Sequence, residues 1–158
     1  MTTSSSICPH KYKGAEILQL IPQRNPFIMV DEFEAREAPT SKDSLTGASC
    51  ATSLYVRLDN YFTLPNGELS ESGLIEHIAQ SASALAGYVA VEQGATQPPV
   101  GMIAELKHFN CHRRPHAGDQ VTTRVTMGFS FGAMTLAHGI SNIGDDIICE
   151  VDLKIFIR

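Results

Sequence analysis

The chain has 158 residues, a length typical of one domain. Its 43% hydrophobic and 18% charged residues indicate a globular protein with a buried core, and its longest apolar stretch is too short to span a bilayer. The formal net charge of -5 argues against nucleic-acid binding, which usually requires a basic face. We therefore expect one soluble domain with neither a nucleic-acid nor a membrane partner.

Four cysteines are spread along the chain without a CxxC pair: Cys8, Cys50, Cys111 and Cys149. This pattern favours free thiols in a reducing cytosol, so we expect a cytoplasmic protein without disulfides. The first residues, MTTSSSICPHKYKG, lack the charged start and apolar run of a signal peptide. We expect residues 1–13 to form a flexible leader and residues 14–158 to form a single domain.

The first half of the chain predicts a short helix, two strands and a long helix. Residues 15–21 (AEILQLI) have helical spacing, whereas residues 27–33 and 44–53 have strand character and should pair with each other. In residues 71–93, apolar side chains return every three or four positions. Ser70 or Ser72 can cap this long helix, and Gly94 is suited to closing it.

Four further strands are predicted after Pro98 and Pro99. They cover residues 100–109, 120–129, 133–143 and 147–157, and glycine-containing turns separate them. The order of elements predicts an α+β fold in which an antiparallel sheet covers the apolar long helix.

Three segments carry a resemblance to a known family: IPQRNPFIMVDEF (21–33), SGLIEHIAQSASALAGY (72–88) and HRRPHAGDQVTTRVT (112–126). With these segments in this order, residues 17–157 resemble the hot-dog-fold 3-hydroxyacyl-[acyl carrier protein] dehydratases. The middle segment is the most specific, because its acidic residue followed by Ala-Gln resembles the family's catalytic helix. The resemblance implies a hot-dog fold, with an antiparallel sheet wrapped around one long central helix.

In that family the active site is shared across a dimer interface, where a histidine of one protomer and a helix carboxylate of the other face the same acyl thioester. Glu76 matches the carboxylate, so the resemblance implies that Glu76 is catalytic. The family's histidine position is occupied by Phe62, which we assign to substrate binding, and residues 60–72 contain no histidine. The family's Pro-Gly at the helix start is replaced by Ser70-Glu71.

A narrower resemblance accounts for the missing histidine. The loop containing Asn66-Gly67-Glu68-Leu69 is similar to the histidine-lacking dehydratase-like subunits of aryl polyene pigment pathways. The resemblance implies a histidine-bearing hot-dog paralogue that completes one composite site per heterodimer with Glu76. Self-pairing as a homodimer is the alternative when that partner is absent.

Elimination of water from a 3-hydroxyacyl thioester requires a base for the α-proton and an acid for the departing hydroxyl. We assign the acid role to Glu76, with Gln80 at i+4 as its hydrogen-bond partner and as a substrate-binding residue. Backbone N–H groups near Ser72 and Gly73 are expected to polarise the thioester carbonyl. His77 is discounted as the base, because adjacent helical residues diverge by about 100°.

Two further clusters are visible in the sequence. A group of possible metal ligands lacks a carboxylate and a CxxC motif, which favours a surface cluster over a zinc site: His108, Cys111, His112 and His116. We expect no metal and no cofactor. A concentration of positive charge is either a solvated loop or a docking surface for phosphopantetheine phosphate or an acidic acyl carrier protein: Lys107, Arg113 and Arg114.

Three functions follow from these patterns. The first is a dehydratase (hydro-lyase) subunit of fatty acid or polyene biosynthesis that contributes Glu76 to a composite site. The second is a non-catalytic pseudo-dehydratase that stabilises its partner. The third is a hot-dog acyl thioesterase, in which a carboxylate activates water and the product is a free acid.

Overall fold

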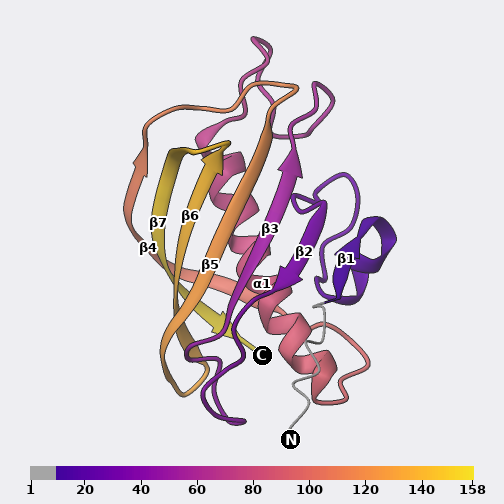
Figure 1. Ribbon diagram of the computed structural model, residues 1–158, viewed down its shortest axis with the longest axis vertical. Helices are drawn as coiled ribbons and strands as arrows, with labels where there is room; N and C mark the ends of the chain where they lie inside the picture. The colour runs from indigo at the N-terminus through magenta and orange to yellow at the C-terminus, as the bar shows by residue number, and fades with distance from the viewer. Residues whose placement is uncertain (1–9) are drawn as a thin grey trace, which may run out of the picture.

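A seven-stranded antiparallel sheet curves around one long helix in the computed structural model of the chain, which describes residues 10–158 (Figure 1). The strands lie in the order β1-β2-β3-β5-β6-β7-β4. Their bounds are Lys11–Lys13, Glu32–Ala35, Ser49–Tyr55, Gly101–Cys111, Gln120–Phe131, Met134–Ile143 and Asp146–Ile157 for β1 to β7. The 3-10 helix η1 (Gly14–Gln19) follows β1, and α1 (Glu71–Glu92) lies between β3 and β4 in the chain. The predicted α+β hot-dog fold is confirmed.

Helix α1 begins and ends close to the predicted positions. Ser70 is the N-cap, because its Oγ accepts a hydrogen bond from the Gly73 N–H at 3.1 Å. Gly94 adopts a φ of +93°, the left-handed conformation that closes many helices. Within the described residues, no helix is long and apolar enough to cross a membrane.

The inner face of the sheet packs closely on α1. The helix lies chiefly against β3 and β5, in the middle of the sheet (Figure 1). Gly139 of β6 allows Ile78 of α1 to sit directly on the sheet, since a Cβ at position 139 would collide with the Ile78 side chain. Leu74 and Leu85 are also buried on this side of the helix. This packing explains why the helix forms the axis of the molecule.

The strand predicted over residues 27–33 is displaced in the structure. Only Glu32–Ala35 forms a strand, β2, which pairs with β3 as expected. The backbone before it is held by a helix side chain instead of a sheet ladder, because Gln80 accepts from the Met29 N–H and donates to the Phe27 carbonyl. Within this segment Met29 and Val30 are apolar because they are buried in the core, without belonging to a strand.

Strand β1 lies within the segment expected to be a leader. Residues 11–13 pair with residues 32–34 of β2, and Tyr12 is buried with its ring centroid 6.0 Å from that of Phe33. The sheet therefore begins before residue 14, the expected start of the domain. Residues 1–9, the remainder of the expected leader apart from His10, lie outside the described residues.

Among the described residues, strand β4 forms one edge of the sheet and pairs with β7 alone. Ile103 and Leu106 lie opposite Ile155 and Leu153, so their side chains share the inner face with these core residues. Their exposure differs sharply: Ile103 and Leu106 are 41% and 37% exposed, whereas Ile155 and Leu153 are 4% and 2% exposed. Helix α1 therefore leaves the inner face of β4 uncovered.

Candidate active site

Glu76 is half-buried in the first half of α1 and has one side-chain partner. Its Oε1 accepts a hydrogen bond from the Gln80 Nε2 at 2.7 Å, the i+4 contact that the sequence predicts. Gln80 is 1% exposed and uses its amide fully, because Nε2 also donates to the Phe27 carbonyl and Oε1 accepts from the Met29 N–H, both at 2.7 Å. Gln80 therefore fixes the position of the carboxylate.

An aromatic cluster lies beside this contact. The ring of Tyr61 packs edge-on against Phe27 and Phe62, with centroid distances of 5.0 and 5.5 Å. Tyr61 and Phe27 are exposed by 65% and 45%, so the cluster presents an apolar surface to solvent. Phe62, at the position of the family's histidine, is half-buried and has neither a proton to donate nor a lone pair to accept one.

The amino end of α1 packs tightly against the same loop. A Cβ added to Gly73 would lie 2.7 Å from the Phe62 Cβ, so glycine is required at this contact. The Gly73 N–H is already bonded to the Ser70 Oγ, whereas Ser72 is exposed, with its Oγ 3.2 Å from the Ser70 Oγ. Of the two backbone groups expected to polarise a thioester carbonyl, the one at Gly73 is therefore occupied by the helix cap.

The buried His77 side chain is hydrogen-bonded to groups other than Glu76. Its Nδ1 lies 2.6 Å from the Met29 carbonyl, which can only accept, so Nδ1 carries the proton and Nε2 accepts from the Thr123 hydroxyl at 2.8 Å. Burial lowers the pKa of His77 to about 4, and the ring is neutral near pH 7. Both ring nitrogens are engaged, so His77 does not serve as a base beside Glu76.

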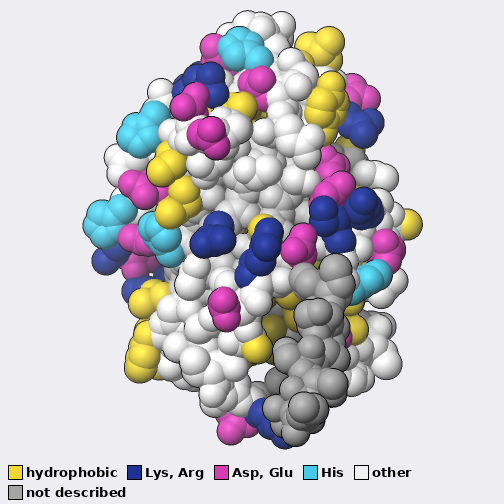
Figure 2. Space-filling model, in the orientation of Figure 1, with side chains coloured by type: hydrophobic (Ala, Val, Ile, Leu, Met, Phe, Trp, Pro, Cys, Tyr) yellow, Lys and Arg dark blue, Asp and Glu magenta, His cyan; other side chains and the backbone are white. Residues whose placement is uncertain are grey.

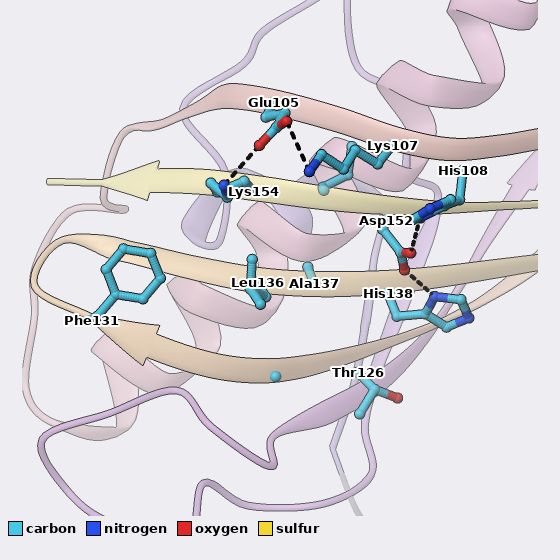
Figure 3. A pocket seen from close by; sticks show the side chains of 12 residues that line it. Glu105, Lys107, His108, Thr126, Phe131, Leu136, Ala137, His138, Asp152 and Lys154 are labelled. Carbon is cyan, nitrogen blue, oxygen red and sulfur yellow. Dashed lines mark hydrogen bonds and ion pairs between the residues drawn. The ribbon is translucent and has the colours of Figure 1, made fainter.

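The histidines of the outer face of the sheet lie far from this arrangement. His108 and His138 both hydrogen-bond Asp152, at 2.9 and 2.6 Å, and line a cavity of about 720 Å³ on the side of the sheet opposite α1 (Figure 3). The hydrogen bond from His138, followed by that from His108, holds the pKa of Asp152 below its usual range. This His-Asp-His group was not predicted, because His138 and Asp152 come together only through the pairing of β6 with β7.

No metal site is present among the described residues. They contain no group of three or more His, Cys, Asp or Glu side chains arranged to hold an ion. Of the histidines suspected of metal binding, His108 bonds Asp152, and His116 lies 3.8 Å from a Glu68 carboxylate oxygen.

The three cations assigned to carrier docking each have an acidic neighbour. Lys107 lies 3.3 Å from Glu105 and lines the outer cavity (Figure 3), and Arg113 lies 4.0 Å from Asp146. The structure does not gather the three cations around one cavity. On the face of the molecule drawn in Figure 2, cationic and acidic side chains are interspersed.

Arg114 is the cation placed nearest the start of α1. Its guanidinium lies 3.4 Å from Glu68 and 3.9 Å from Glu71, the first residue of the helix. Of the three cations, Arg114 is therefore the one whose position is tied to the end of the helix that carries Glu76.

The helix and the edge strand together leave an uncovered surface. Residues 78–91 of α1 contain no Asp, Glu, Lys or Arg, yet the helical stripe formed by Glu76, Ala79, Ser83 and Ala90 is only half-buried. A solvent-facing helix side usually carries charged residues. Five cavities on the described residues are lined by other side chains and not by Glu76. Glu76 is therefore a positioned carboxylate on an open, half-buried surface of α1.

Comparisons with known proteins agree with this architecture. Residues 15–157 match the family model described as ApeP-like, ApeP dehydratase. The 3-hydroxyacyl-[acyl-carrier-protein] dehydratase FabZ of Verminephrobacter eiseniae is 24% identical over 143 residues, which is 90% of this chain and 91% of that protein.

Solved structures share the fold. The dehydratase heterocomplex ApeI:P from Xenorhabdus doucetiae contains a chain that superposes with a TM-score of 0.76 at 13% identity, covering 90% of each chain. Cj0977 from Campylobacter jejuni gives a TM-score of 0.62 at 10% identity, covering 93% of this chain and 94% of that one. The E. coli PaaI protein gives 0.56 at 8% identity, with 78% and 82% covered.

Proposed function

The chain belongs to the ApeP-like family of dehydratases, and on that premise we propose that it contributes Glu76 to a composite active site for the dehydration of 3-hydroxyacyl-[acyl carrier protein]. A second hot-dog subunit supplies the histidine. The observation that carries this proposal is the carboxylate of Glu76, held by the buried amide of Gln80 in a half-site where the family's histidine position is Phe62.

The chemistry divides between the two subunits. The partner's imidazole removes the α-proton of the acyl thioester, and the electrons form the new C=C bond as the C–O bond breaks. Glu76 gives its proton to the departing hydroxyl, so an enoyl thioester and water are the products. Gln80 donates to the Glu76 Oε1, which leaves the second carboxyl oxygen to hold the transferred proton.

The uncovered face of α1 and the free edge of β4 form the proposed partner interface. Ile103 and Leu106 gain burial if a second sheet continues from β4. A second helix packed beside residues 78–91 buries a part of α1 that has no charged side chain to desolvate. The heterocomplex formed by ApeI:P supports a hot-dog partner over an unrelated one.

The substrate is proposed to arrive on an acyl carrier protein. Its phosphopantetheine phosphate or acidic surface is recognised by Arg113 and Arg114, with Lys107 further along the edge strand. Ser72 and its backbone N–H lie at the exposed start of α1, where a thioester carbonyl would be polarised, and Phe62 with its aromatic neighbours contacts the acyl group.

The decisive experiment compares the chain alone, a histidine-bearing hot-dog partner alone and the purified complex, each with a 3-hydroxyacyl-[acyl carrier protein] analysed by mass spectrometry. We expect enoyl product from the complex only. Glu76→Gln should lower the rate of elimination by about 10²–10⁴-fold, the range typical of a lost general acid.

Glu92→Gln is the matched control, because it removes the same charge from the other end of the same helix. The control complex should retain its activity. A Glu76→Gln complex that turns over at the wild-type rate would show that the chain is a scaffold for its partner. Release of a free acid in place of the enoyl thioester would identify a thioesterase.

A further inference from the structure

A row of small polar side chains crosses the inner face of the sheet beneath α1. Five residues from five neighbouring strands are in register: Thr52, Thr123, Ser141, Cys149 and Cys111. Residues directly opposite each other in antiparallel strands point to the same face, so the two cysteines lie side by side at the edge-strand end of the row.

The backbone pairing sets the distance between the two cysteines. The His112 N–H donates to the Ile148 carbonyl at 2.7 Å, which makes residues 112 and 148 a hydrogen-bonded pair. Because such pairs alternate along an antiparallel ladder, Cys111 and Cys149 form a non-hydrogen-bonded pair, whose Cα atoms lie about 4.5 Å apart. Disulfides join cysteines whose Cα atoms are about 4.4–6.8 Å apart, so Cys111 and Cys149 can be bridged without rearrangement of the backbone.

The two thiols differ in their exposure to solvent. Cys149 is fully buried and its pKa is raised to about 11 by burial, with further contributions that include the Cys111 thiol. Cys111 is only partly buried, and burial followed by the charge of Glu71 raises its pKa. Both thiols are present as free cysteines, one reachable from solvent and one not.

Hydrogen bonds link the rest of the row as far as Ser141, the residue opposite the buried thiol. The Thr123 hydroxyl donates to His77, so its Oγ1 accepts from the Ser141 hydroxyl at 2.7 Å. Ser141 lies directly opposite Cys149 in the pairing of β6 with β7, and its hydroxyl partly offsets the effect of burial on the pKa of the Cys149 thiol. Cys149 therefore lies in register between Ser141 and Cys111.

We propose that Cys111 and Cys149 form a reversible redox pair that closes a cross-strand disulfide between β4 and β7 when the protein meets a peroxide. The Cys111 thiolate attacks one peroxide oxygen, the O–O bond breaks, and Cys111 becomes a sulfenic acid as hydroxide leaves. The Cys149 sulfur then attacks the Cys111 sulfur, the S–O bond breaks, and hydroxide leaves with the thiol proton as water. Two thiols and one hydrogen peroxide give one disulfide and two waters.

The disulfide would constrain the chain where β4 leads into the loop beside the start of α1. After Cys111 the chain enters a loop whose Pro115 carbonyl accepts from the Leu69 N–H at 2.8 Å, immediately before the Ser70 cap of α1. The Cys111 Sγ also contacts the Arg113 carbonyl at 3.6 Å, a contact that the disulfide replaces. Oxidation therefore ties this loop to β7.

Peptide mapping of the full chain tests the proposal directly. Trypsin cleavage after Lys and Arg places all four cysteines in separate peptides. The protein is treated with hydrogen peroxide at mildly alkaline pH, where more thiolate is present, then alkylated under denaturing conditions and digested without reductant. We expect a linked Cys111–Cys149 peptide pair that is lighter than the two free peptides by two hydrogen atoms and is separated by dithiothreitol.

Cys50 provides the matched control. It is buried on the inner face of β3, but the residues opposite it are Ala35 and Val125. Cys50→Ser should leave the linked pair intact, whereas Cys111→Ser should abolish it. The peptide map of the unmutated chain is sufficient by itself to test the proposal. A sulfinic acid at Cys111 beside a reduced Cys149, a bridge to Cys8 or between two chains, or no oxidation would overturn the proposal.

Discussion

Replacing Gln80 with methionine tests whether one buried amide holds the candidate site together. Methionine matches the length of glutamine but neither donates nor accepts a strong hydrogen bond. The variant leaves the buried Met29 N–H and the partly exposed Phe27 carbonyl without their partner. A buried unsatisfied group costs about 1–3 kcal/mol, and the Phe27 carbonyl can recover water, so Gln80→Met should lower the free energy of unfolding by about 1–3 kcal/mol.

Urea unfolding followed by circular dichroism measures this loss, with Gln93→Met as the matched control. The Gln93 Nε2 donates to the Lys42 carbonyl at 3.1 Å, but this bond is exposed, so its removal should change the free energy of unfolding by no more than about 0.5 kcal/mol. Equal losses for the two variants would refute the assignment of Gln80 as the residue that holds the loop on the helix.

Gln80→Glu adds a second test with a pH dependence. The new carboxylate keeps an acceptor for the Met29 N–H, but it turns an oxygen toward the Phe27 carbonyl and the Glu76 carboxylate, where the amide had donated. Protonation restores one donor, so this variant should be less stable at pH 8 than at pH 5, relative to the unmutated chain at each pH. A loss of unfolding free energy that is the same at pH 5 and pH 8 would contradict the contact between residue 80 and Glu76.

Three further predictions concern pH, the partner and the carrier. Folding lowers the pKa of His77 from 6.5 to about 4, so the neutral ring adds to the free energy of unfolding fully above pH 6.5. As the pH falls toward 4, up to about 3 kcal/mol of this free energy is lost. His77→Gln should flatten this part of the pH dependence in a series of urea titrations. Leu106→Lys should abolish co-purification with a hot-dog partner, whereas Leu136→Lys, equally exposed at 38% but on the outer face, should not; equal effects would exclude the β4 edge as the interface. Arg114→Glu should raise the KM for an acyl carrier protein substrate without changing that for a pantetheine thioester, and Lys154→Glu should change neither; a KM unaffected by Arg114→Glu would remove this residue from the docking surface.

The sequence by itself determined the elements that depend on local periodicity. The long helix was predicted within one residue of its observed end, because its apolar spacing, its serine cap and its closing glycine all act within a few residues of each other. The four later strands were predicted for the same reason, since alternation and turn glycines are local signals. The family and its hot-dog fold followed from three segments, of which the one around Glu76 is the most specific; the family match over residues 15–157 confirms the family, and the sheet and its structural relatives confirm the fold.

Only the tertiary structure decided contacts between residues far apart in the chain. Residues 27–30 were predicted as strand because they are apolar, yet the amide of Gln80, fifty or more positions away, binds their backbone instead. In the same way, strand pairing alone places Cys111 opposite Cys149, and no spacing in the sequence reveals it. Periodicity reports which side of an element is apolar; hydrogen-bond geometry between elements decides which groups that side meets.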